Sequence, residues 1–242
     1  MKTILVVGIG TGNPEHLTVQ AINALNRADL LFIPDKGEGK AGLADLRRDI
    51  VSRYVTNPAS RTVEYAVPMR DTANPDYAAG VDDWHAALAT RFAALLTEVP
   101  DEGAGAFLVW GDPGLYDSTI RIIQRLRDRF AVEIIPGITA IQALTAAHGI
   151  ALNRIGEPVH ITTGRKLGEV EDDTIVMLDG QTAFLDADPD LDIFWGAYLG
   201  TPDQITIAGR LGEVRDEIVA TRKAARERHG WIMDTYLLRK RD

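Results

Sequence analysis

The sequence contains no cysteine, and this absence excludes several kinds of chemistry. Disulfides, thiolate zinc sites and cysteine nucleophiles all need a thiol, so none of them supports the fold or the reaction. No apolar run approaches the ~20 residues that a membrane span requires. The amino terminus reaches a glycine turn at Gly8, too soon for a signal peptide. We therefore expect a cytoplasmic protein that does not associate with a membrane.

Positive charge is also scarce in this chain. Against 35 aspartates and glutamates there are 26 lysines and arginines, which leaves a net charge of −9 over 242 residues. Nucleic-acid binders are usually basic, because contacts to phosphate dominate their affinity. We therefore expect no nucleic-acid partner. The apolar content of 45% is that of an ordinary globular protein, and the length suits one large domain or two small ones.

The glycine-rich segment 8–14 (GIGTGNP) lacks the key residues of two common phosphate-binding motifs. A dinucleotide fingerprint needs glycine where Asn13 stands, and a P-loop needs a Gly-Lys-Ser/Thr ending. Two interpretations remain: a tight turn between strand and helix, or a backbone wall against a ligand. Three glycines in five residues favour the wall. A non-catalytic nucleotide-binding module is a remote alternative.

A second turn, residues 110–116 (WGDPGLY), follows the apolar strand 106–110 and precedes a helix through Leu126. Ligands of open α/β sheets bind at the carboxyl ends of the strands. The glycines of this turn allow backbone to approach a ligand closely. Asp112 would then place a carboxylate at that edge.

Five apolar strands alternate with helical segments in the first part of the chain. This alternation predicts a five-stranded parallel α/β sheet with helices on both faces. After Gly149 strands outnumber helices, which indicates a second α/β domain with a mixed sheet. We predict an N-terminal domain over residues 1–152, a C-terminal domain over residues 153–242, and a ligand cleft between them.

Several cations follow the predicted second strand. Lys36, Lys40 and Arg47 lie on its carboxyl side, the edge that also carries the two glycine turns. An acidic protein that keeps cations at this edge can bind an anionic substrate there.

Four motifs in this order carry a family resemblance: GIGTGNP at 8–14, GDPGLY at 111–116, PGITA at 136–140 and GTP at 200–202. With them the chain resembles the tetrapyrrole methylases, the class III S-adenosylmethionine-dependent methyltransferases, over essentially its whole length. The resemblance implies S-adenosylmethionine as cofactor, S-adenosylhomocysteine as product, no metal, and a homodimer.

Within this family, residues 33–37, 43–48, 83–85 and 162–165 most resemble one branch of cobalamin synthesis. The resemblance implies a methyltransferase that methylates carbon 1 of precorrin-5, releases the acetyl group as acetate and gives precorrin-6A. The alternative is a tetrapyrrole methylase that acts on a different ring carbon.

The resemblance also implies which positions contact the cofactor. They are Thr11, Trp110, Gly111, Asp112, Leu115, Thr139, Ala140, Asp179 and Gly200. Two of them depart from the family's usual pattern. Thr11 stands where relatives often have proline, and Asp179 stands where they often have methionine.

Methyl transfer from a sulfonium to carbon is an in-line displacement that needs positioning rather than a covalent intermediate. Loss of the acetyl group would benefit from a base, and Asp112, Tyr116 and His85 are the candidates. A polycarboxylate tetrapyrrole also needs local cations on an acidic protein. The residues expected to bind it are Lys36, Lys40, Arg47, Arg70, Arg165 and Tyr116.

Overall fold

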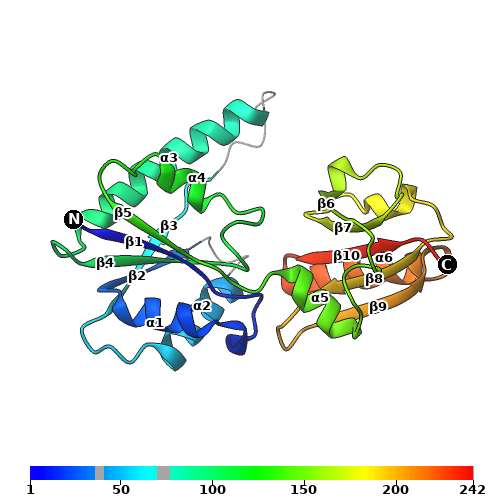
Figure 1. The fold of residues 1–242 in the computed structure, drawn as a ribbon, viewed down its shortest axis with the longest axis horizontal. Helices are drawn as coiled ribbons and strands as arrows, with labels where there is room; N and C mark the ends of the chain where they lie inside the picture. Colours follow the sequence, from blue (N-terminus) through cyan, green and yellow to red (C-terminus); the bar gives the residue numbers. More distant parts are fainter. Residues whose placement is uncertain (36–40, 70–76, 242) are drawn as a thin grey trace. The chain divides into compact units, whose positions relative to one another are not determined.

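The computed structural model of the chain describes residues 1–35, 41–69 and 77–241. The chain forms two compact units, each with its own sheet (Figure 1). The first unit comprises Met1–Gly10 and Pro14–Ile138, and the second comprises Thr11–Asn13 and Thr139–Asp242. The predicted domain boundary between residues 152 and 153 stays a prediction.

The sheet of the first unit is parallel throughout, as the alternation of strands and helices predicts. Its strands lie in the order β3-β2-β4-β1-β5, and every adjacent pair is parallel. The strands are β1 (Thr3–Gly8), β2 (Leu30–Asp35), β3 (Arg61–Ala66), β4 (Ala104–Val109) and β5 (Ala131–Ile135). Strands β1 and β4 are central and nearly continuously buried, which is why both read as unbroken apolar runs.

Helices cover both faces of this sheet, so that part of the prediction is confirmed (Figure 1). They are α1 (Val19–Arg27), α2 (Ala41–Tyr54), α3 (Tyr77–Thr97) and α4 (Thr119–Gln124), with a short 3-10 helix η1 (Pro14–His16) before α1. One core joins α3 and α4 to the sheet through Phe32, Phe92 and Phe107. A second core joins α1 to the other face through Leu25 and Leu31.

The second unit contains a mixed sheet, as the sequence predicted for the part of the chain after Gly149. Its strand order is β6-β7-β10-β8-β9; β6 and β7 are parallel, and the other adjacent pairs are antiparallel. The strands are β6 (Val159–Thr163), β7 (Asp173–Met177), β8 (Asp192–Ala197), β9 (Ile205–Arg210) and β10 (Asp234–Arg239). The long helix α6 (Leu211–His229) and the 3-10 helices η3 (Gly164–Lys166) and η4 (Ala183–Asp186) belong to the same unit.

Helix α5 (Ala140–His148) follows β5 in the sequence but packs against β8 and β10 of the second sheet. His148 Nε2 lies 3.0 Å from the Trp195 carbonyl oxygen, and Gly149 ends the helix in the left-handed conformation. The five-fold alternation alone would place this helix on the first sheet, so the structure differs here. Among the helices of the described ranges, none is both long and apolar enough to cross a bilayer.

Candidate functional site

Three loops of the first unit meet at the carboxyl edge of its sheet, after β1, β4 and β5. An alanine Cβ at Gly137 would lie 2.2 Å from the Gly111 carbonyl oxygen and 2.9 Å from the Gly8 backbone. A Cβ at Gly8 would lie 2.6 Å from the Gly137 nitrogen. The three backbones are therefore in direct contact, and glycine at positions 8 and 137 is what allows this approach. The shared edge that the sequence predicted for the first two glycine turns is confirmed, and the loop after β5 lies against both of them.

Hydrogen bonds lock the first two of these loops together. Gly111 N donates to Gly10 O at 2.8 Å, and Gly10 N donates back to Gly111 O at 3.3 Å. Both glycines have positive φ, +76° at Gly10 and +68° at Gly111. This isolated antiparallel bridge joins the two loops beyond the ends of the parallel strands β1 and β4.

The carboxylate of Asp112 ties the second loop to the third. Its Oδ1 accepts from Gly114 N at 2.7 Å within its own turn. Its Oδ2 accepts from Gly137 N at 2.8 Å, across to the loop after β5. Backbone amides that donate to a carboxylate form stronger hydrogen bonds than those between neutral groups. Asp112 therefore organises the edge with both of its oxygens.

The other residues of the loop after β4 differ in burial and in backbone conformation. Trp110 is half-buried, and Leu115 is half-buried with its amide bonded to Asp112 O at 3.2 Å. Tyr116 has a φ of +51°, and 43% of its surface is exposed. A left-handed tyrosine costs backbone energy, and such strain clusters at functional sites.

His85, the histidine among the candidate bases, lies on α3 and is buried. Its Nε2 has no hydrogen-bond partner among the residues that the structure describes. Burial, reinforced by the nearby charge of Arg125, lowers the pKa of His85 and keeps the ring neutral. His85 lines neither of the two cavities below.

The expected cofactor residues of the second unit lie at turns and helix ends. Thr139 caps α5: its Oγ1 accepts from Ile141 N at 3.1 Å, and its own amide donates to Gln142 Oε1 at 3.0 Å. Ala140 is the first residue of that helix. Gly200 has a φ of +81°, which suits glycine. Thr11, which also belongs to the second unit, is buried.

Asp179 is only 4% exposed, and its carboxylate points into the protein. It accepts from Gln181 N at 2.9 Å, Ala183 N at 2.7 Å and the Tyr236 hydroxyl at 2.8 Å. Burial and the Asp179 charge raise the pKa of Tyr236. Leu178, which directly follows β7, is exposed and has a φ of +53°. The contact between Asp179 and the cofactor stays a prediction.

We expect Asp179→Ala to lower the free energy of unfolding by about 3–5 kcal/mol, because it leaves three donors without their charged acceptor. Urea denaturation of the full chain measures this change. Asp186→Ala is the matched control, since Asp186 is exposed in η4. Equal stability of the two variants would contradict the role assigned to Asp179.

The predicted substrate cations differ in what surrounds them. Arg47 is buried, with only 6% of its surface exposed. Arg165 is exposed in η3. The other three, Lys36, Lys40 and Arg70, lie outside the described residues.

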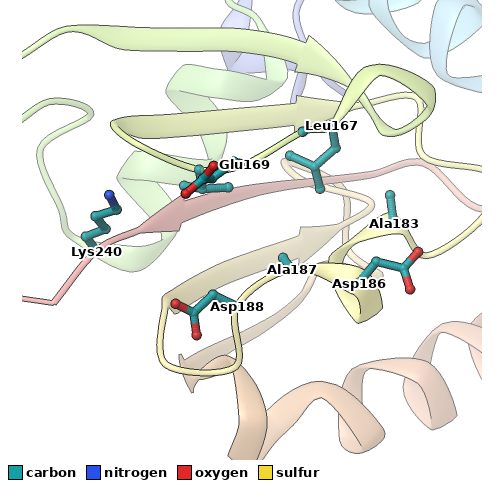
Figure 2. Close-up of a pocket in the computed structure, with 9 residues that line it drawn as sticks. Leu167, Glu169, Ala183, Asp186, Ala187, Asp188 and Lys240 are labelled. Carbon is teal, nitrogen blue, oxygen red and sulfur yellow. The ribbon is translucent and has the colours of Figure 1, made fainter.

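A cavity of about 480 Å³ lies in the second unit (Figure 2). Its charged lining residues are Glu169, Asp186, Asp188 and Lys240. Figure 2 shows that the two aspartate carboxylates point in different directions rather than to one centre. Within the described ranges, no group of three potential metal ligands occurs.

The smaller cavity, about 130 Å³, lies in the first unit and includes Trp110 of the Gly-Asp-Pro turn in its lining. Its polar lining comes from Arg47, Tyr65, Asp117, Ser118 and Thr119. Sequence reasoning missed Tyr65 and Asp117. The available signal was position: Tyr65 is the second-last residue of β3, and Asp117 directly follows the turn after β4.

Comparison with known proteins gives consistent matches. The model of the family described as Tetrapyrrole (Corrin/Porphyrin) Methylases matches residues 3–215. The chain is 59% identical to the precorrin-6A synthase [deacetylating] of a Sinorhizobium species, over 99% of this chain and 96% of that protein. A crystal structure of a cobalamin synthesis related protein (CobF) from Corynebacterium diphtheriae superposes with a TM-score of 0.87 at 44% identity, and the match covers 100% of both chains.

A more distant structure shares the fold. It is the uroporphyrin-III C-methyltransferase of Thermus thermophilus, complexed with S-adenosylhomocysteine. Its TM-score is 0.61 at 19% identity, and the match covers 98% of this chain and 92% of that one.

Proposed function

Since the chain belongs to the tetrapyrrole (corrin/porphyrin) methylases, we propose that it is a C-methyltransferase of cobalamin synthesis. It transfers a methyl group from S-adenosylmethionine to carbon 1 of precorrin-5, and a water molecule hydrolyses off the acetyl group, which leaves as acetate, to give precorrin-6A. The observation that carries this proposal is the likeness, over nearly the whole chain, to a precorrin-6A synthase. The alternatives, a sister methylase or a nucleotide-binding module, are not favoured by that likeness.

The geometry of the loop edge supports a transfer reaction of this kind. An in-line displacement needs the donor methyl and the acceptor carbon held at a near-attack distance, with water excluded. The loops after β1, β4 and β5 are fixed by backbone contacts and by Asp112. We propose that the backbone of Trp110, Gly111 and Asp112 lines the cofactor and that Leu115 packs beside it. The contacts of Thr11, Thr139, Ala140, Asp179 and Gly200 stay predictions.

Two of the three candidate bases for acetyl removal are poorly placed for it. Asp112 already accepts two backbone amides, and His85 is buried on α3. Both carboxylate oxygens of Asp112 are thus engaged in holding the loops, and burial shields the His85 ring from solvent. Tyr116 is exposed at the edge, and we propose that it contacts the tetrapyrrole.

The mass of the product tests this function. The purified full chain is incubated with S-adenosylmethionine and precorrin-5, and the product is analysed by mass spectrometry. We expect a product that has gained one methyl group and lost the acetyl group, with acetate released in equal amount. A product that is methylated but keeps its acetyl group would identify a sister methylase and contradict the proposal. The homodimer stays a prediction, which analytical ultracentrifugation tests.

A further inference from the structure

Arg47 carries a buried positive charge that is not paired with a carboxylate. On α2 its Nε donates to Leu108 O at 3.1 Å, and its Nη1 donates to Leu43 O at 2.9 Å. A guanidinium has five N–H donors, so three remain without a partner in the part of the chain that the structure describes. Burial lowers the pKa of Arg47, because the low-dielectric surroundings disfavour the charged form.

The hydroxyl of Tyr65, like part of the Arg47 guanidinium, is a donor without a partner among the described residues. Tyr65 is 6% exposed near the end of β3, and its ring packs edge-on against Phe92 and Phe107. The hydroxyl forms no hydrogen bond with any residue in the described ranges. Burial raises the pKa of Tyr65, so the hydroxyl is a neutral donor. Tyr65 lines the smaller cavity, so a ligand in that cavity can accept a hydrogen bond from the hydroxyl.

Both groups line the smaller cavity of the first unit. Its volume of about 130 Å³ is well above the ~10–15 Å³ that one water molecule requires. Apolar walls come from Trp84, Phe92 and Phe107. The cavity therefore combines a guanidinium and a hydroxyl with aromatic walls, which suits a carboxylate on a short apolar chain.

One carboxylate, that of Asp117, also lines this cavity. Its Oδ1 accepts from Thr119 N at 2.6 Å. Its charge raises the pKa of Arg47, against the larger effect of burial, but no ion pair forms between the two side chains. The guanidinium therefore keeps donors for a second anion, and a buried charge without direct pairing favours such a ligand.

We propose that the cavity of Arg47 and Tyr65 is a binding site for one short-chain carboxylate. Arg47 holds the carboxylate by charge-assisted hydrogen bonds, Tyr65 donates its hydroxyl, and the aromatic walls pack on the methylene groups. This inference rests on the proposed function for its two sources: an acid arm of the tetrapyrrole, or the acetate that the reaction releases. The lining residue Trp110 connects this site to the Gly-Asp-Pro turn.

The first test compares Tyr65→Phe with Tyr54→Phe in the full chain. Tyr65→Phe removes only a hydroxyl that has no partner in the described protein, so the urea unfolding midpoint should not fall. We expect the KM for precorrin-5 to rise about five- to tenfold, with the Kd for S-adenosylhomocysteine unchanged. Tyr54 packs in the core on the other face of the sheet, and Tyr54→Phe should change neither constant.

The second test does not depend on the reaction. Sodium acetate is titrated into the ¹⁵N-labelled full chain at constant ionic strength, and the Nε–H signal of Arg47 is followed by NMR. Its loss in Arg47→Lys assigns the signal. We expect a saturable shift with acetate and none with sodium chloride. In Tyr65→Phe the half-saturating acetate concentration should rise about fivefold.

The outcomes separate the two sources and the two proposals. A raised KM in Tyr65→Phe identifies a tetrapyrrole arm as the ligand. A saturable acetate shift with an unchanged KM identifies the released acetate. An unchanged KM together with no saturable shift overturns the site. If precorrin-5 is not converted at all, the proposed function fails, and the acetate titration alone then decides whether the cavity binds a carboxylate.

Discussion

Gly137→Ala is expected to lower the free energy of unfolding by about 3 kcal/mol or more and to weaken S-adenosylhomocysteine binding at least tenfold. The added Cβ would lie 2.2 Å from the Gly111 carbonyl oxygen and within 2.9 Å of Gly8. These neighbours are backbone atoms, so no side chain can rotate away. The loop after β5 must shift, and the loops after β1 and β4 must shift with it.

Urea denaturation measures the first effect, and isothermal titration calorimetry with S-adenosylhomocysteine measures the second. Gly168→Ala is the matched control, because an added Cβ at Gly168 meets no atom within 4 Å. It should leave stability within about 0.5 kcal/mol, as surface substitutions usually do. A Gly137→Ala variant that behaves like this control would show that the loops are not in contact.

Asp112→Ala is expected to raise the Kd for S-adenosylhomocysteine about 10- to 100-fold and to lower the free energy of unfolding by about 1–3 kcal/mol. The variant removes the acceptor of Gly137 N and of Gly114 N together. Gly114 is exposed, so water can replace part of its bond, whereas Gly137 is half-buried and loses more. Because the carboxylate links two loops, binding should suffer more than stability.

The same two measurements apply here, with two comparison variants. Asp112→Asn keeps the shape but turns one acceptor into a donor, so it should fall between wild type and Asp112→Ala. Asp128→Ala changes an exposed aspartate of the same unit and should alter neither quantity. If Asp112→Ala destabilised the protein without weakening the binding of S-adenosylhomocysteine, the carboxylate would support the fold but not the proposed site.

Arg47 is a residue whose burial and hydrogen-bond partners the sequence did not predict. Its place on the carboxyl side of the second strand predicted a cation that binds an anionic substrate. The structure buries it, and its guanidinium donates to the carbonyl oxygens of Leu43, one turn earlier on α2, and of Leu108 in β4. Helical spacing can predict the contact with Leu43, but the sequence does not report that Leu108, 61 residues away, lies within reach. Asp179 is a similar case: its carboxylate bonds to Tyr236, which is 57 residues away along the chain.

The sequence by itself determined the two kinds of sheet and the glycine loops at the strand ends. The sheets can be predicted from local periodicity, because parallel strands buried on both faces must be continuously apolar. The loops can be predicted from their glycines, because close approach of backbones requires this residue. Only the tertiary structure decided that α5 packs on the second sheet and that the Asp112 carboxylate accepts hydrogen bonds from the amides of Gly114 and Gly137. Such contacts depend on which surfaces and amides come together when segments distant in the sequence pack, and local sequence does not report which segments these are.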